Sequence, residues 1–386
     1  MRKYKVVIEK RTDREEIVDF LAKIYGPNYF DARRVFAAIF DHEPSLLPQN
    51  LILARSNRGD LVGVVRIVDR KILVDGVILE CGGISSVGVH SQWREKGVCT
   101  ALMNEAIKIM VERGKEISIL HGRRAMDGFY VQYGYSGIGR YADLEVDYPK
   151  GEPKLRAVRF QSGNLTLLRK MYDKTYRPLA GSFVRDAGVW NYLLALAKND
   201  NDRIKVFVYQ KGKAGVGYFV VIDKKIIEMA VGKEHFLSVA ALNRSLGVDS
   251  MALHPRHPFH IFCRTHLNTT AKERFALDGG YMGRIINLQN LLKKLVSAFA
   301  SRAGVLGVGD QVLKLLGYEI NLKDEKIYKT NEINDILFKK KATIIRILLG
   351  VVDLCDVEGI IWNKQKPWIP YLFKGLYYHT NAWDEV

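Results

Sequence analysis

The chain has 386 residues, of which 48% are hydrophobic and 26% are charged. This length is too great for one hydrophobic core to be the default, so we expect two or three domains of ordinary globular composition. The formal net charge of +17 comes from 59 lysines and arginines against 42 aspartates and glutamates. Because the basic residues are spread over the whole chain, we interpret the surplus mainly as a solubilising surface, although it would also attract an anionic cofactor or an acidic polymer.

No stretch of the sequence has the character of a membrane span. The most apolar part, 342–354, contains Arg346 and Asp353, whereas a span needs about 20 predominantly apolar residues. The basic start of the chain is followed by too few apolar residues for a signal peptide. We therefore expect a cytoplasmic protein that does not act in a membrane. Its four cysteines lie far apart, without the spacing of a metal or redox motif, and we expect them to be reduced.

Residues 1–150 alternate between strand and helix patterns. In chain order we expect a strand at 4–9, a helix at 13–24, a hairpin of 51–55 with 61–68, a long strand at 77–89, a helix at 98–111, a buried strand at 117–120, a short helix at 127–133 and a closing hairpin at 136–146. The helix at 98–111 has one apolar stripe, which indicates that it packs on a sheet.

A second series follows a linker at 149–153, which is marked by its prolines and glycine. It comprises a helix at 162–176, strands at 205–209, 215–222 and 225–231, a helix at 235–245 and a strand at 250–253. The order matches that of the first series, so we interpret it as a degenerate repeat. From about residue 285 the pattern changes to a helix at 288–299 and short mixed elements. The fold class is α+β.

The most informative stretch is 87–100, which leaves a strand and opens a helix. The first turn of a helix has unpaired N–H groups and a positive dipole end, and it therefore binds anions such as a diphosphate. Gly97 permits a close approach of the backbone, while Arg94 and Lys96 add positive charge. Simple packing of a strand–glycine–helix turn is the alternative for the loop taken alone.

Two features of this region resemble the GNAT N-acetyltransferase superfamily. The spacing of Arg94, Gly97 and Cys99 directly after Val87-Gly88-Val89 is similar to its coenzyme A signature. The segment 129–135, Phe-Tyr-Val-Gln-Tyr-Gly-Tyr, looks like the aromatic helix of the same superfamily. The two occur in the expected order, with a buried strand between them. Glu95 and Cys99 are departures from the usual loop, which often carries more arginines and a smaller third residue.

The whole chain also resembles the Eis (enhanced intracellular survival) family of multi-domain GNAT proteins. The segment 282–288 is similar to the junction into the third domain of that family. The resemblance implies a catalytic GNAT domain at 1–150, a degenerate GNAT-like domain at 151–284 and a sterol-carrier-like domain at 285–386. It implies acetyl-CoA as the cosubstrate.

The resemblance also assigns roles to single residues. It implies that backbone groups of Val87 and Val89 align the pantetheine arm. The cofactor's diphosphate would lie on the amides of Gly97, Val98, Cys99 and Thr100, near Arg94 and Lys96. Tyr130 would be the general acid that protonates the leaving thiolate, with packing in the core as the alternative for this side chain.

The general base is left open between three groups. The resemblance implies the carboxylate of Val386, at the end of the sequence, with a frayed terminus as the alternative. His121, at the end of the buried strand, is a second candidate, and Glu80 is a third.

Other chemistry finds less support in the sequence. His254, His257, His260 and His266 are interrupted by prolines and have no regular ligand spacing, so we expect no metal site. Cys99 could be a nucleophile at a helix N-terminus, but an inert small residue is the favoured interpretation.

The sequence therefore predicts an acetyl-CoA-dependent N-acyltransferase that acts on a primary amine of a small molecule. The alternatives are an acyltransferase for protein lysines or a modified nucleic acid, and a non-catalytic acyl-CoA-binding protein. A homo-oligomer remains open, as does the identity of the acceptor. A polycationic acceptor would need acidic walls, for which the candidates are Asp31, Asp41, Glu43, Asp384 and Glu385.

Overall fold

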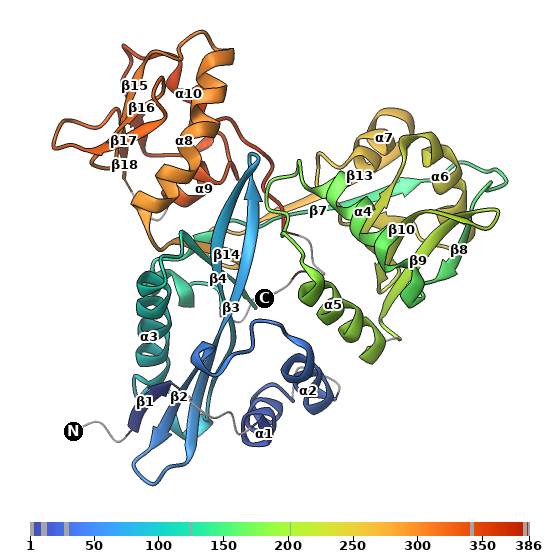
Figure 1. Ribbon diagram of the computed structural model, residues 1–386, viewed down its shortest axis with the longest axis horizontal. Coiled ribbons are helices and arrows are strands. Elements are labelled where there is room, and N and C mark those ends of the chain that lie inside the picture. The colour runs from blue at the N-terminus through green and yellow to red at the C-terminus, as the bar shows by residue number, and fades with distance from the viewer. Residues whose placement is uncertain are drawn as a thin grey trace.

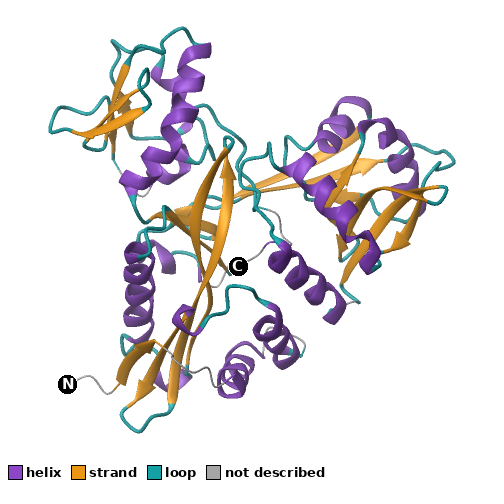
Figure 2. Cartoon of the chain, viewed as in Figure 1, coloured by secondary structure: helices purple, strands orange, loops and turns teal. Residues whose placement is uncertain are grey.

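The structure is a computed structural model that describes residues 4–8, 14–26, 31–123, 126–200, 202–339, 343–380 and 384, without the side chains of 140–142 and 274–275. Its elements gather in three lobes, which follow one another along the chain (Figure 1). Two seven-stranded sheets and two small ones carry the fold, with helices packed against the two large sheets (Figure 2). The expected α+β class is confirmed.

The first sheet occupies the N-terminal lobe. Its strands, in spatial order, are β1 (Tyr4–Ile8), β2 (Leu51–Ser56), β3 (Leu61–Val74), β4 (Val77–Val89), β5 (Ile117–Gly122), β14 (Gly280–Ile285) and β6 (Ser136–Gly137). Neighbours are antiparallel except β4 and β5, which are parallel and are connected by α3 (Val98–Glu112). This strand–helix–strand unit places the loop 90–97 at one end of the sheet.

Helices cover the first sheet on both faces because its strands are apolar on both. Along β2, Ile52 and Ala54 share a core with α3, whereas Leu51 and Leu53 share one with α1 (Arg14–Tyr25) and α2 (Ala32–His42). A side chain at Gly82 would overlap the sulfur of Met110 on α3. Glycine at this position therefore lets α3 lie close to the sheet.

The second sheet repeats this plan in the middle lobe. Its spatial order is β8 (Arg156–Arg159), β9 (Ile204–Lys211), β10 (Ala214–Ile222), β11 (Lys225–Val231), β12 (Ser250–Met251), β7 (Arg140–Asp147) and β13 (Asn268–Phe275). β11 and β12 are parallel and are connected by α6 (Phe236–Ser245), as β4 and β5 are by α3. The core on one face includes α4 (Leu165–Tyr176) and α5 (Ala187–Asn199), and that on the other includes α6 and α7 (Pro258–His266). The expected repeat is thus present.

Each large sheet contains one strand from the other part of the chain: β7 lies in the second sheet and β14 lies in the first. The expected hairpin at 136–146 is therefore wrong. β6 pairs with β14, and β7 pairs with β12 and β13 in the other sheet. β14 and β7 hold the same place in their sheets, one strand before the edge. Sequence spacing indicates strands but not their partners, so two neighbouring strands read as a hairpin. The domain bounds at 150 and 284 stay a prediction, since each large sheet takes a strand from beyond them.

The C-terminal lobe is built on α8 (Leu288–Val305). It contains the sheet of β15 (Val312–Leu315), β16 (Tyr318–Asn321) and β17 (Lys326–Lys329), the pair of β18 (Ile336–Phe338) and β19 (Ile360–Trp362), and the helices α9 (Ile344–Leu348) and α10 (Ile369–Leu372). Its core includes Ile72, Val74 and Leu79, so the lobe packs on the far ends of β3 and β4. Its sterol-carrier-like character stays a prediction. No described helix is long and apolar enough to cross a membrane.

His257, a buried histidine of the middle lobe, serves the fold. His257 caps α7, because its Nδ1 accepts from the Phe259 N–H at 3.1 Å, and its Nε2 lies 2.9 Å from the Met229 carbonyl oxygen. A neutral imidazole satisfies both contacts, and a protonated one would lose the cap. Among the described residues, no three His, Cys, Asp or Glu side chains are placed to hold a metal ion.

Burial makes the stability of this lobe depend on pH. It lowers the pKa of His257 to about 4 from the ordinary 6.5. Between these values the unfolded chain binds a proton that the folded chain does not, so stability is full above pH 6.5 and falls as the pH falls toward 4. We expect His257→Asn, which keeps a capping oxygen, to make this slope shallower by up to about 1.4 kcal/mol per pH unit. Urea unfolding at pH 6.5, 5.5 and 4.5 measures the slope, and an unchanged slope would contradict the expectation.

Candidate active site

A gap opens in the first sheet between β4 and β5. The two strands pair only from Cys81 to Ile84 on β4, against Ile117 to Leu120 on β5. Beyond this point the pairing of β4 with β3 shifts by one residue, and Ser86 adopts a φ of 51°. Such a bulge bends its strand, so the end of β4 stays with β3 and separates from β5.

The backbone of the last residues of β4 faces this gap. The His90 N–H donates to the Val62 carbonyl oxygen at 2.9 Å. Because antiparallel pairing alternates, the polar groups of Val89 point away from β3. The carbonyl oxygen of Val87 accepts a hydrogen bond from the Tyr25 hydroxyl at 2.7 Å. The structure therefore places Val87 and Val89 along the gap, with one of their acceptors already bonded to α1.

The N-terminus of α3 lies across the same gap. Gly97 precedes the helix with a φ of 76°, a left-handed conformation that favours glycine. No side chain of the described residues caps this end, and the first helical bond runs from the Ala101 N–H to the Gly97 carbonyl at 3.0 Å. The N–H groups of Val98, Cys99 and Thr100 are thus available for an anion.

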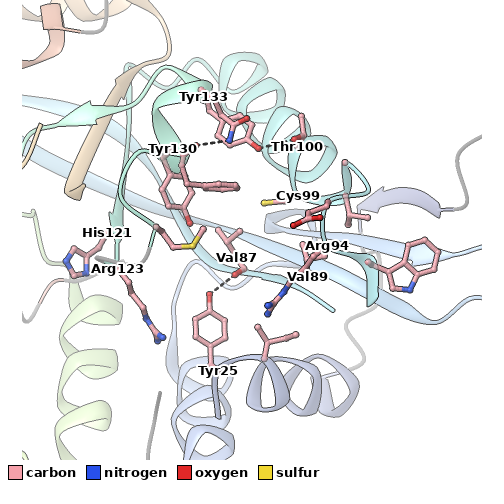
Figure 3. A pocket seen from close by; sticks show the side chains of 18 residues that line it. Tyr25, Val87, Val89, Arg94, Cys99, Thr100, His121, Arg123, Tyr130 and Tyr133 are labelled. Carbon is pink, nitrogen blue, oxygen red and sulfur yellow. Dashed lines mark hydrogen bonds between the residues drawn. The ribbon is translucent and has the colours of Figure 1, made fainter. Parts of the chain in front are cut away.

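A cavity of about 710 Å³ joins the gap to the helix end. Figure 3 shows Tyr25 and Arg123 at one side, Val87 and Val89 behind, Cys99 and Thr100 at the α3 end, and Tyr130 and Tyr133 above. The complete lining is Ile24, Tyr25, Val87, Val89, Trp93, Arg94, Glu95, Gly97, Val98, Cys99, Thr100, His121, Arg123, Met126, Phe129, Tyr130, Gln132 and Tyr133. The loop and the aromatic turn, which are thirty residues apart in sequence, therefore enclose one space.

The charged residues of the loop divide into two groups. Arg94 and Glu95 line the cavity, and Glu95 has a φ of 60°. Lys96 is not in the lining, and its ammonium lies 5.5 Å from the centre of the Trp93 ring. Of the two predicted cations, the structure thus brings only Arg94 to the cavity.

Cys99 lines the cavity but has the character of an inert thiol. It is the second residue of α3, where a helix dipole would lower a thiol pKa. Burial instead raises the pKa of Cys99 to about 11. The thiol is therefore protonated at neutral pH, which does not favour the nucleophile interpretation.

Tyr130 reaches the cavity from a short 3₁₀ turn, Phe129–Tyr133, within the stretch 127–133 where a short helix is expected. Gly128 and Gly134 bound this turn with φ values of 80° and 79°. The Tyr130 ring packs edge-on against Phe129 and is 7% exposed. Burial raises the pKa of its hydroxyl far above the ordinary value of 10. The hydroxyl therefore keeps its proton throughout the neutral range.

The neighbouring tyrosines are engaged with the protein. The Tyr133 hydroxyl lies 3.1 Å from Thr100 Oγ1, and the buried Tyr135 hydroxyl lies 2.7 Å from Ser118 Oγ. Ser118 in turn donates to the Gly82 carbonyl oxygen at 2.6 Å. Within the described residues no hydrogen bond holds the Tyr130 hydroxyl, so it is the tyrosine of this turn that can serve a ligand.

The three candidate bases are placed differently. His121, near the end of β5, packs against the tilted ring of Tyr281 with ring centres 4.7 Å apart, and it lines the cavity. Glu80 lies within ion-pair distance of Lys71 and Lys115, at 3.4 and 3.5 Å, and does not line it. Val386 lies outside the described residues.

Sequence reasoning did not find Tyr25 and Arg123. Both line the cavity, and the Arg123 guanidinium lies 5.1 Å from the centre of the Tyr25 ring. Tyr25 is the last residue of α1 and Arg123 directly follows β5. Their proximity depends on how α1 packs across the sheet, and no spacing in the sequence indicates it.

Comparison with known proteins agrees with this geometry. Residues 9–138 match the family model described as an acetyltransferase (GNAT) domain. This part of the chain is a GNAT domain. It holds the gap, the α3 loop and the Tyr130 turn, and the second sheet is GNAT-like in its strand order.

Curated relatives also match part of the chain. The N-acetyltransferases Eis of Mycobacterium tuberculosis and Mycobacterium bovis are 26% identical to the chain over 261 residues. The match covers 61% of this chain and 62% of each relative, so the chain spans less than two thirds of their length.

Solved structures share the fold along the whole chain. The GCN5-related N-acetyltransferase from Anabaena variabilis has a TM-score of 0.68 at 14% identity, covering 98% of this chain and 97% of its own. Eis1 from Mycobacterium abscessus has a TM-score of 0.67 at 15% identity, covering 99% and 100%. All three lobes therefore follow the fold of these proteins.

Proposed function

We propose that the chain transfers an acetyl group from acetyl-CoA to a primary amine of a small-molecule acceptor. The observation that carries this proposal is that one cavity holds both the uncapped N-terminus of α3 and the protonated hydroxyl of Tyr130. The first is suited to a diphosphate and the second to a leaving thiolate. The GNAT match of the domain that contains the cavity supports the same reaction.

The donor would lie along the gap. The N–H groups of Val98, Cys99 and Thr100 would bind the diphosphate, with Arg94 beside it, and the outward backbone of Val89 would align the pantetheine arm. Val87 offers its N–H, while its carbonyl keeps the bond to Tyr25. In this placement the thioester reaches the cavity next to Tyr130.

The proposed transfer is direct. The neutral amine attacks the thioester carbonyl carbon, an N–C bond forms, and the C–S bond breaks as the sulfur takes the electron pair. The amine proton goes to a base, and the sulfur ends as a thiol. Because a thiol is a stronger acid than a buried tyrosine, Tyr130 acts first by donating a hydrogen bond to the sulfur as charge develops there, and any proton it gives up is restored from the amine through the base.

Two groups remain proposed as that base. His121 lies in the lining of the cavity, and the carboxylate of Val386 is implied by the resemblance to Eis proteins. His121→Gln and a chain extended beyond Val386 distinguish them, because loss of the base lowers kcat itself, whereas loss of a group that only helps to bind the acceptor raises KM.

The structure argues against a polycation as the acceptor. Asp41 pairs with Arg14 at 2.8 Å, Glu43 with Arg70 at 2.6 Å, and Asp384 with Arg185 at 2.7 Å. Asp31 caps α2 and pairs with Arg34, and Glu385 lies outside the described residues. In the described lining of the cavity, Glu95 is the acidic side chain and is opposed by Arg94 and Arg123. We therefore propose an acceptor with one amine and low positive charge.

The test is acetyl-CoA consumption by the whole chain across a panel of amines. Turnover with small amines such as amino acids and amino sugars supports the proposal. Turnover with polymers alone would indicate protein lysines or a modified nucleic acid as acceptors. Binding of acetyl-CoA without turnover on any amine would leave a binding protein and overturn the proposal.

We expect one coenzyme A per chain, although the fold contains two similar sheets. In the second sheet the turn from β11 to α6 is short, and the carboxylate of Glu234 occupies the space beside Gly232. This negative charge lies where a diphosphate would have to approach, and it repels one. Isothermal titration calorimetry should give a stoichiometry of one, and a value of two would contradict the expectation.

A further inference from the structure

A buried ionic cluster lies where the first sheet, the middle lobe and the end of the described chain meet. It consists of three arginines and three carboxylates, each at most 6% exposed: Arg66, Arg70, Arg185, Glu43, Glu228 and Asp384. Their formal charges cancel. Because one carboxylate is Asp384, the cluster is neutral only when the end of the chain is docked.

Arg185 is the residue that joins the end of the chain to the middle lobe. Its Nε and Nη2 donate to the two carboxylate oxygens of Asp384 at 2.8 and 2.7 Å. Its Nη1 and Nη2 donate to those of Glu228 at 2.9 and 2.6 Å. The guanidinium also lies over the rings of Tyr172 and Trp190, at 4.0 and 4.8 Å from their centres. Two bidentate pairs on one arginine, 199 residues from Asp384, form a specific anchor.

Residues 376–380 and Asp384, which we call the end segment, make further contacts with different lobes. The Leu376 N–H donates to the Gly350 carbonyl oxygen in the C-terminal lobe at 2.7 Å. The His379 N–H donates at 3.1 Å to the carbonyl oxygen of Ala180, a residue of the segment before α5. Gly181 has a φ of 93°, and a Cβ there would lie 2.5 Å from the His379 carbonyl oxygen. The end segment is therefore fitted against its neighbours at the level of the backbone.

The same cluster reaches β4, the strand whose last residues line the cavity. Arg66 donates from Nη2 to Ser85 Oγ at 3.0 Å. Ser85 directly precedes Ser86, the bulge residue at which β4 leaves β5. Glu43, which is bonded to Arg70, is within electrostatic range of Arg66, and Asp384 is within range of Arg70. The charge of Asp384 therefore acts on Arg70, which is bonded to Glu43, and Glu43 lies near Arg66, which holds Ser85 beside the bulge.

We propose that Arg185 is a positioning residue that docks the end segment through Asp384, and that turnover in the cavity depends on this docking. Among the described residues, removing the Asp384 charge leaves Glu228 as the carboxylate paired with Arg185 and gives the cluster a net positive charge, which is strongly unfavourable in a buried site. The end segment then separates, water enters, and the support of the bulge is lost. The second half of this proposal rests on the proposed acetyl transfer, while the docking does not.

The experiment compares Asp384→Asn with two matched variants of the full chain. Glu228→Gln removes the same charge from the same guanidinium without altering the end segment, and Asp384→Glu keeps the carboxylate. Hydrogen exchange of peptides that cover 376–386 measures docking, and steady-state kinetics with an active amine measures turnover. For Asp384→Asn we expect at least tenfold faster exchange and at least tenfold lower kcat, with the KM for acetyl-CoA within twofold. We expect Asp384→Glu to restore kcat to within threefold.

A second variant removes the docking without changing charge. Gly181→Ala places a methyl group against the His379 backbone and should release the end segment as Asp384→Asn does. Unchanged exchange in both variants would overturn the docking. If Glu228→Gln accelerated the exchange of 376–386 as much as Asp384→Asn does, the role of Asp384 would be overturned, because the exchange would then report loosening of the middle lobe. Release with unchanged kcat would overturn the dependence of turnover. If the unmodified chain turned over no amine, the proposed function would fail, and the exchange data would still decide the docking.

Discussion

Replacing Gly97 with glutamate should abolish coenzyme A binding and leave the chain folded. Gly97 directly precedes α3 with a φ of 76°, and the atom nearest to an added Cβ is the Tyr4 hydroxyl, at 3.5 Å. A side chain therefore fits, at a strain of about 1–2 kcal/mol for the left-handed backbone. A carboxylate at this position interacts favourably with the positive end of the helix dipole, so α3 remains stable. The same carboxylate neutralises the anion site from within and repels the diphosphate.

Calorimetry with coenzyme A measures this effect, and Gly97→Ala is the matched control. The alanine variant has the same backbone strain without the charge, so we expect it to lose less than tenfold in affinity. For the glutamate variant we expect a loss of at least about 100-fold, which corresponds to about 2.7 kcal/mol. If the glutamate variant bound like the alanine variant, the cofactor would lie elsewhere in the molecule.

The parts of the site that depend on local chain geometry could be predicted from the sequence. A glycine before an apolar helical stripe indicates both the left-handed residue and the helix end, and α3 begins at Val98 as expected. The long strand at 77–89 also agrees with β4 in both bounds. Lys96 shows the limit of such reasoning, because its side chain lies against Trp93 and is not part of the lining, which the spacing of the loop does not indicate.

What depends on distant partners could not be predicted. β3 extends to Val74, six residues beyond the expected end, through Asp69, Arg70 and Lys71. These charged residues indicate a loop when no partner is known. Arg70 can be buried because it donates two hydrogen bonds to the carboxylate of Glu43, which lies in a different part of the chain. The helices α2 and α5, which pack against each other, were missed for the same reason.

Asp384 illustrates the same point at the site. From the sequence, it was a candidate acidic wall for a cationic acceptor. In the structure its two oxygens are bonded to Arg185, so its charge is already balanced. The proposed preference for an acceptor of low positive charge follows from such pairings, which no pattern along the chain reveals.

Tyr130→Phe should lower kcat by about 10²–10³-fold and leave coenzyme A affinity within twofold. The ring stays, so its packing against Phe129 is kept, but the hydroxyl that we propose as the donor to the leaving sulfur is lost. A positioned acid typically contributes 10²–10⁴-fold. The effect should be independent of pH between 6 and 9, because burial raises the pKa of Tyr130 well above that range and the hydroxyl carries its proton throughout.

Tyr135→Phe is the matched control for this prediction. It removes a hydroxyl close to the same turn, one that is bonded to Ser118 and is fully buried outside the lining of the cavity. We expect a loss of about 1 kcal/mol in the free energy of unfolding and an unchanged kcat. Single-turnover rates at saturating acetyl-CoA separate the chemical step from product release. If both variants lost kcat equally, the Tyr130 hydroxyl would act through packing of the turn. A loss in Tyr130→Phe alone would place the proton donor at this residue.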